Sequence, residues 1–276
     1  MPRAPGPRLT DGRLIYAIGD VHGCYELLRD LLALIARDDA GRGGRGRPLL
    51  VFLGDYVDRG LQSARVVEAL VWLQRRPDLE VRLLKGNHEQ ALLEFLDAPE
   101  RAGLWLGFGG AETLAAYGVI PPRADDRPCE FVRARDELLD RMPAAHLKLL
   151  QGLELMVEAG DYVFVHAGVR PGVPLERQTE RDLLWIRKGF LDAAGPFEKV
   201  VVHGHTWEGE APQLLAHRLG LDTGAYATGV LTALRLCDGE REVLQARRPV
   251  EDVWTRRPLA DLAAAAERAR ETSPQS

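Results

Sequence analysis

The sequence contains few cysteines and no long hydrophobic run. Cys24, Cys129 and Cys237 lie far apart and are odd in number, so they form neither a disulfide framework nor a zinc knuckle. Free thiols of this kind are typical of a reducing compartment, and we therefore expect a cytoplasmic protein. No uninterrupted apolar stretch reaches transmembrane length. Met1–Thr10, with three prolines and no apolar core, does not resemble a secretory signal.

An excess of positive charge is also absent. The 276 residues carry 36 Lys and Arg against 41 Asp and Glu, a net charge of −5. Proteins that bind nucleic acids by neutralising phosphates are usually basic, so general nucleic-acid binding is not expected. The Gly/Arg-rich stretch 41–48 lacks the Lys-Ser/Thr pair of a nucleotide-binding phosphate loop, and we interpret it as a surface turn. We find no internal repeat and no indication of oligomeric state.

The chain does contain short apolar runs that alternate with helical patterns, which predicts an α/β fold with parallel strands. In the first part of the chain, strands and helices are expected in turn at Leu14–Ile18, Cys24–Arg37, Leu49–Leu53, Ser63–Arg75, Val81–Leu84 and Glu89–Leu96. Residues 99–160 differ, with Trp105, a Gly109-Gly110 pair and a helical pattern around Phe131–Leu150. We predict that they form a mostly helical insertion above the strand ends.

The second part of the chain returns to strands. The sheet is expected to continue at Asp161–Val165 and Lys199–Val202, and an antiparallel segment to close the fold at Gln213–Arg218, Val230–Leu236 and Glu242–Ala246. An Ala-rich helix follows at Leu259–Arg270. We expect one domain over residues 14–250, with flexible tails at 1–13 and 271–276.

Five of these strands end in residue types that bind metals, namely Asp20 and His22, Asp55, Asn87, His166, and His205. Ligands of open α/β sheets gather at the carboxyl ends of strands, and oxygen donors with imidazoles suit Mn²⁺, Fe²⁺ or Zn²⁺. Taken singly, His166 has the alternative of a structural histidine, Asn87 of a turn residue and Asp20 of a helix cap. Five such endings at one topological position favour a metal site.

The motifs around these residues resemble those of a known family. GDVHG at 19–23, GDYVDRG at 54–60 and GNHE at 86–89 look like the three signature motifs of PPP-type metallophosphatases, within the calcineurin-like phosphoesterase superfamily. HAG at 166–168 and GHT at 204–206 match its remaining ligand motifs in order. The resemblance spans residues 14–236 and is greatest to bacterial and phage protein-serine/threonine phosphatases. It implies a two-sheet β-sandwich with flanking helices and a helical insertion over the active site.

The resemblance also implies two divalent metal ions per chain, with Mn²⁺ expected first and Fe, Zn or Ni also suited to the ligands. Asp20 and His22 would hold one metal, Asp55 would bridge, and the second would be held by Asn87, His166 and His205. Two divalent cations with only two aspartates leave a positive site that attracts phosphate. A metal-bound hydroxide would then attack phosphorus in line.

Further roles follow from the same motifs. His88 is the expected general acid, and Asp58 the carboxylate that orients it. Arg59 is expected to bind phosphate oxygens. Arg187 matches a phosphate-binding arginine of the bacterial branch, with a surface position on a helix as its alternative.

Two histidines near one strand end could each be the metal ligand. His203 and His205 would face the same side of a regular strand, and only the resemblance selects His205 as the ligand. His203 is then expected to support the site or the core, and Asp222 to be structural.

The substrate has alternatives. The first expectation is phosphomonoester hydrolysis by a phosphoserine/phosphothreonine protein phosphatase, acting on a phosphoprotein or small phosphoester. The rival is a symmetrical bis(5′-nucleosyl)-tetraphosphatase or capped-RNA-end hydrolase, whose second motif resembles GDLVARG. Asp58, and Glu89 after His88, favour the first. A scaffold that has lost activity is disfavoured because all six ligand positions are filled. Specificity is expected in residues 99–160 and 169–182.

Overall fold

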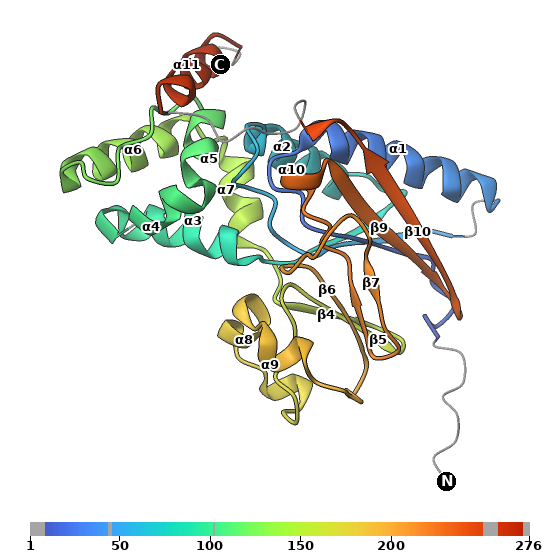
Figure 1. Ribbon diagram of the computed structural model, residues 1–276. Helices are drawn as coiled ribbons and strands as arrows, with labels where there is room; N and C mark the ends of the chain where they lie inside the picture. The colour runs from blue at the N-terminus through green and yellow to red at the C-terminus, as the bar shows by residue number, and fades with distance from the viewer. Residues whose placement is uncertain (1–8, 44–45, 102, 251–258, 273–276) are drawn as a thin grey trace.

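The structure is a computed structural model that describes residues 9–43, 46–101, 103–250 and 259–272 (Figure 1). Within these residues two five-stranded sheets pack face to face. The first has the order β10-β9-β1-β2-β3 and the second β4-β5-β6-β8-β7. The first sheet consists of β1 (Ile15–Ile18), β2 (Leu49–Phe52), β3 (Glu80–Leu83), β9 (Val230–Cys237) and β10 (Glu240–Arg247). The second consists of β4 (Met156–Ala159), β5 (Tyr162–Val165), β6 (Val200–His203), β7 (Gln213–Leu214) and β8 (Arg218–Gly220).

The alternation of side chains along each strand builds three apolar layers. In β1, Ile15 and Ala17 face the second sheet, where they meet residues such as Phe164 of β5. Tyr16 and Ile18 point the other way, into the layer covered by helices. Every residue of β1, β2, β5 and β6 is buried. Because both faces are covered, these strands are continuous apolar runs, apart from His203 at the end of β6. The predicted two-sheet sandwich with flanking helices is confirmed.

Helices cover the outer faces of both sheets. Three follow the first strands: α1 (Tyr25–Gly41), α2 (Ser63–Gln74) and α3 (Asn87–Asp97). The segment between α3 and β4 contains η1 (Pro99–Arg101), α4 (Gly103–Trp105), the π-helical turn η2 (Leu106–Gly110), α5 (Ala111–Ala116), α6 (Pro128–Arg141) and α7 (Ala144–Gln151). The second sheet is covered by η3 (Leu175–Arg177), α8 (Glu180–Trp185) and α9 (Lys188–Leu191). Figure 1 shows α3–α7 grouped on one side of the molecule, and α8 and α9 below them.

Two expectations about strands need correction. The last residues of the 99–160 segment form β4, which pairs antiparallel with β5 through a turn at Gly160, whose φ of +55° suits glycine. A run of only four residues carries little strand signal, so only the pairing defines β4. The single strand expected at 213–218 is divided into β7 and β8, which pair with each other.

The chain ends differ in how they attach to the fold. Residues 1–8 and 273–276, predicted as parts of the tails, lie outside the described residues. Thr10 is buried and its hydroxyl donates to the carbonyl of Arg13, while its N–H donates to Asp238. Near the other end, α10 (Ala225–Thr228) precedes β9, and α11 (Leu259–Thr272) packs on α5. Among the described helices, none has the length and apolar character needed to span a membrane.

Candidate metal centre

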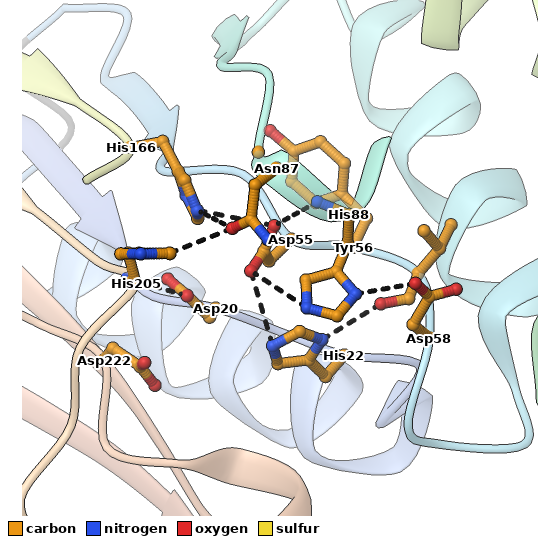
Figure 2. A network of polar contacts seen from close by, with 12 residues as sticks. Asp20, His22, Asp55, Tyr56, Asp58, Asn87, His88, His166, His205 and Asp222 are labelled. Carbon is orange, nitrogen blue, oxygen red and sulfur yellow. Dashed lines mark hydrogen bonds and ion pairs between the residues drawn. The ribbon is translucent and has the colours of Figure 1, made fainter. Parts of the chain in front are cut away.

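The six predicted metal ligands converge at the carboxyl ends of the strands, where the two sheets meet (Figure 2). The loops after β1 and β2 are joined by backbone hydrogen bonds from the N–H groups of Val21 and His22 to the carbonyl of Asp55, 3.0 and 2.8 Å long. The N–H of Gly204 donates to the carbonyl of His166 across the second sheet. All six side chains are buried: Asp20, His22, Asp55, Asn87, His166 and His205.

Asp55 lies at the middle of the group. Its Oδ2 is 3.5 Å from Nε2 of His22 and 3.9 Å from Nε2 of His88, while its Oδ1 is 3.4 Å from Nε2 of His166. Two sets of possible ligand atoms share it: His22, Asp55 and His88, and Asp55, His166 and His205, each set within 4.8 Å. One carboxylate facing two sets of donors has the geometry of a bridging ligand.

Asn87 completes the second set. Its amide Oδ1 lies 2.9 Å from Nε2 of His166 and 2.9 Å from Nδ1 of His205. The Nδ1 of His166 lies 2.8 Å from the carbonyl of Leu53, which fixes the ring and directs Nε2 to the centre. An oxygen and two imidazole nitrogens thus face a common point.

Asp20 supplies a further observation that fits a cation. Its Oδ2 accepts the N–H of His205 at 2.9 Å, but its buried Oδ1 has no hydrogen-bond partner. A buried oxygen without a partner costs free energy, which a bound cation would remove. Burial raises the pKa of Asp20, and the carboxylates of Asp222 and Asp55 raise it further. The donor set therefore fits divalent cations.

The lowered pKa values of the predicted histidine ligands keep their imidazoles neutral, with a nitrogen lone pair for a metal. Burial, with the neighbouring His88, lowers the pKa of His22 to about 3, and burial with His166 lowers that of His205 to about 2. Burial also lowers the pKa of His166. Burial alone would raise the pKa of Asp55, but the surrounding imidazoles outweigh it and hold that pKa below its ordinary value. Neutral imidazoles and an ionised carboxylate are the forms that bind metals.

His88 is paired with Asp58, as predicted. Nδ1 of His88 lies 2.6 Å from Oδ2 of Asp58. Burial lowers the pKa of His88, but the carboxylates of Asp55 and Asp58 overcome this and raise it to about 9. The structure also brings His88 into the first set of possible ligands, while Asp20 lies outside both sets.

Two residues that sequence reasoning missed hold Asp58. The indole Nε1 of Trp105 donates to its Oδ2 at 2.9 Å, and the hydroxyl of Thr113 donates to its Oδ1 at 2.6 Å. Both come from the 99–160 segment. Trp105 is conspicuous in the sequence, but no pattern connects it with Asp58. Thr113 belongs to no motif that would have identified it.

Glu89 does not face the pocket. Its carboxylate accepts the backbone N–H groups of Gly86, Asp55, Tyr56 and Val57, 2.7–3.1 Å away. Glu89 therefore ties the loop after β2 to the start of α3. Because this carboxylate contacts backbone N–H groups and not the pocket, its position supports neither substrate over the other.

The backbone of the site is strained. Seven non-glycine residues of the described chain have φ between +35° and +71°, and five of them lie here: His22, Asp55, Asp58, Arg59 and His205. Such conformations cost of the order of 1–3 kcal/mol each and persist where the surroundings impose them. Their concentration at one place marks this region as functional.

A pocket of about 460 Å³ opens onto the centre. Arg59 and Arg187 both line it, and Nε of Arg187 lies 3.1 Å from Nε2 of His205. Arg187 is the exposed N-cap residue of α9 and also lines the pocket, so it is placed where it could reach a bound phosphate. Aromatic side chains form much of the remaining wall: Trp105, Phe108, Trp185, Trp207 and Tyr226. The 169–182 loop, expected to cover the site, contributes no residue to this lining.

His203 and Asp222 lie beside the centre. His203 packs its ring against Phe190, and its Nδ1 lies 3.0 Å from the carbonyl of Gly204. Burial lowers the pKa of His203 to about 4. Asp222 accepts the N–H of Gly224 at 2.9 Å and lines the pocket. Burial raises the pKa of Asp222 to about 7.

Comparison with known proteins identifies the family. The calcineurin-like phosphoesterase family matches residues 13–223. The chain belongs to this family. It is therefore a metallophosphoesterase, a hydrolase of phosphoesters, with His and Asp groups that could hold two metal ions.

Relatives of this metallophosphoesterase carry informative names. The symmetrical bis(5′-nucleosyl)-tetraphosphatase of Methylococcus capsulatus is 31% identical over 231 residues, which cover 81% of this chain and 66% of that protein. The asymmetrical bis(5′-nucleosyl)-tetraphosphatase PrpE of Anoxybacillus flavithermus is 25% identical over 252 residues, covering 84% and 94%. A crystal structure of a putative diadenosine tetraphosphatase superposes with a TM-score of 0.59 at 20% identity, covering 88% of this chain and all of that one. This last likeness shows the fold alone.

Proposed function

We propose that this metallophosphoesterase hydrolyses bis(5′-nucleosyl) tetraphosphates. The observation that carries the proposal is the pocket, which places Arg59 and Arg187 beside planar aromatic side chains. Such a site suits a ligand with phosphates at its centre and flat bases at its ends. Two relatives named as enzymes of this kind support the proposal. Asp58 and Glu89 do not distinguish a protein phosphatase from a tetraphosphatase. Glu89 contacts only backbone N–H groups, and Asp58 orients His88 whichever leaving group is present.

The metal ligands that we propose are those predicted from the sequence. Asp20 and His22 would hold one divalent cation, Asn87, His166 and His205 the other, and Asp55 both. When bound, such cations supply Lewis-acid stabilisation of the phosphoryl charge and a nucleophile at neutral pH. The unpaired Oδ1 of Asp20 supports its part in the assignment, and the two donor sets support His22 on one side of Asp55 and His166 with His205 on the other.

The remaining site residues would act on the substrate directly. Arg59 and Arg187 would bind phosphate oxygens with their guanidinium groups. His88 would donate a proton to the leaving oxygen, since a pKa of about 9 keeps it protonated at neutral pH. Asp58 would hold the imidazole so that Nε2 faces the reacting phosphate.

A comparison of substrates tests the proposal. Purified, Mn²⁺-loaded protein is assayed with diadenosine tetraphosphate, a phosphoserine/phosphothreonine peptide and a phosphotyrosine peptide. We expect the largest kcat/KM for the dinucleotide. Chromatography of its products separates symmetrical cleavage, which yields ADP, from asymmetrical cleavage, which yields AMP and ATP. A larger kcat/KM for either peptide would overturn the proposal.

A further inference from the structure

A second cavity of about 410 Å³ adjoins the catalytic pocket. The two share four residues: Ala91, Trp105, Phe108 and Trp185. We call the whole second cavity the α3 groove. Its other lining residues are Glu94, Phe95, Asp97, Ala98, Arg101 and Leu104. It is the continuation of the pocket away from the metal centre.

The direction of the groove follows from helix α3. Asn87 and His88 stand in the first turn of α3, at the centre, and Ala91, Glu94, Phe95 and Ala98 recur along the helix at spacings of three and four residues. One face of α3 therefore runs from the metal centre into the groove. Glu94 lies seven positions after Asn87 in the helix, about 10 Å along the axis. That length is comparable with one nucleoside phosphate.

The walls of the groove carry large apolar side chains that are exposed to solvent. Leu104 is 78% exposed, Phe108 53% and Trp185 45%. The indole Nε1 of Trp185 donates to Oε1 of Gln90 at 2.7 Å, which fixes the ring, and its ring centre lies 6.4 Å from that of His205. A preformed aromatic wall thus reaches from the metal centre to the groove, and apolar surface of this kind marks a binding site.

The two cavities differ in the charged residues that line them. The catalytic pocket has the guanidinium groups of Arg59 and Arg187 beside the carboxylates of Asp55 and Asp222, and the divalent cations proposed to bind there would make it positive. The groove has the carboxylates of Glu94 and Asp97 against the single guanidinium of Arg101. A phosphate is therefore drawn to the pocket, whereas the groove favours an uncharged flat ring whose amino groups can donate to carboxylates.

We propose that the α3 groove is the subsite for one nucleobase of the substrate, an inference that rests on the proposed function. The base would stack against the aromatic rings of Phe108 and Trp185 and contact Leu104, while its phosphates lie at the metal centre. Stacking on aromatic side chains is the usual way in which proteins hold bases without a duplex. The groove thereby selects nucleotides over phosphates that carry no base.

The first experiment measures kinetics with and without a base. Leu104 lines the groove but not the catalytic pocket, so Leu104→Asn changes only the subsite. We expect KM for diadenosine tetraphosphate to rise about fivefold with kcat unchanged, because a polar side chain weakens apolar contact with the base. The kcat/KM for inorganic tripolyphosphate, which has no base, should stay unchanged. The control is Leu139→Asn on α6, an exposed leucine that lines neither cavity.

The second experiment measures binding without turnover. Adenosine is titrated into the protein by saturation-transfer NMR, with ribose as the control ligand. We expect adenosine alone to bind, and its Kd to rise at least fivefold in Leu104→Asn and in Phe108→Ala but not in Leu139→Asn. Equal adenosine binding by all four proteins, or none by the wild type, would overturn the subsite.

The two experiments separate the subsite from the proposed function. Groove-dependent adenosine binding with no hydrolysis of diadenosine tetraphosphate would refute the function and keep the subsite. Hydrolysis of the dinucleotide with KM and adenosine binding insensitive to Leu104→Asn would keep the function and refute the subsite. If a phosphopeptide with a bulky apolar residue, rather than adenosine, lost affinity in Leu104→Asn, the groove would be a peptide site and the inference wrong.

Discussion

Asp58 and His88 form a pair whose parts come from different places in the chain. Asp58 follows β2 and His88 lies in the first turn of α3. The two groups that hold Asp58, Trp105 and Thr113, belong to the segment after α3. The result is a histidine with one nitrogen bound and the other directed at the metal centre. This is the arrangement of an oriented acid.

We predict that His88→Ala keeps both metals but loses most turnover on substrates with poor leaving groups. The loss on an alkyl phosphate should exceed that on p-nitrophenyl phosphate by at least about 10-fold, because an aryl leaving group needs little protonation. Steady-state kinetics and metal analysis measure the two effects. Equal losses on both substrates would contradict the acid role. Loss of a metal would instead make His88 a ligand, as its distance to Asp55 permits.

Asp55 is the other residue whose position has a clear consequence. Since its two oxygens face separate sets of histidines, Asp55→Asn should weaken metal binding at both positions. Anomalous scattering from Mn²⁺-soaked crystals would measure the occupancy of each. Asp182→Asn is the matched control, a buried aspartate of α8 that does not line this pocket and should retain both metals. One fully occupied site in Asp55→Asn would rule out a shared ligand.

At the scale of elements, the segment α4-η2-α5 carries Trp105 and Thr113 to Asp58. Its π-helical turn contains Gly109, with φ of +114°, and a Cβ at this position would clash with the backbone nitrogen of Arg59. Gly110 is pressed in the same way against the ring of Trp105. The Gly109-Gly110 pair of the sequence thus permits close approach of this segment to the loop after β2, which carries Asp58 and Arg59.

Gly109→Ala should therefore separate the segment from the loop. We expect the free energy of unfolding to fall by about 1–3 kcal/mol and kcat to fall with it, because Asp58 loses its support. Urea denaturation and steady-state kinetics measure both. Gly107→Ala is the control: this glycine is exposed in the same turn, and an added Cβ meets no atom within 4 Å. Similar behaviour of the two variants would show that close approach at Gly109 is not needed.

For the whole molecule, buried acidic groups couple metal binding to pH. Burial raises the pKa of Glu89, and of Asp222, to about 7, and that of Asp20 above its ordinary value. In the metal-free protein these folded-state pKa values exceed the unfolded ones, so the groups stabilise the fold below about pH 4. This contribution is lost as pH rises through about 7. Bound cations would offset the resulting negative charge.

The difference in Tm between Mn²⁺-loaded and EDTA-treated protein should consequently be larger at pH 8 than at pH 5.5. Metal affinity rises with pH for the same reason, because Asp20 must lose its proton to bind. Thermal denaturation at fixed ionic strength over this pH range measures the effect. A Tm difference that is constant or falls with pH would show that these carboxylates do not control metal binding.

The family and fold were predicted correctly because they depend on local patterns. Apolar runs such as Leu49–Leu53, each followed by a polar motif, are visible in the chain itself and specify buried parallel strands with a site at their ends. Strand β4 was missed, because its four residues are defined by pairing with β5. The preference for a protein phosphatase, for which Glu89 was one argument, was not supported, since a residue type does not tell which way its carboxylate points.

The order of the motifs by itself determined the family, the sandwich and the residues proposed to bind metals, because each motif is read within a few neighbouring positions. Only the tertiary structure decided that Trp105 and Thr113 hold Asp58, that Arg187 faces the pocket and that an apolar groove continues along α3. These features depend on contacts between segments distant in the sequence. Such contacts arise when the chain packs, and no local pattern encodes them.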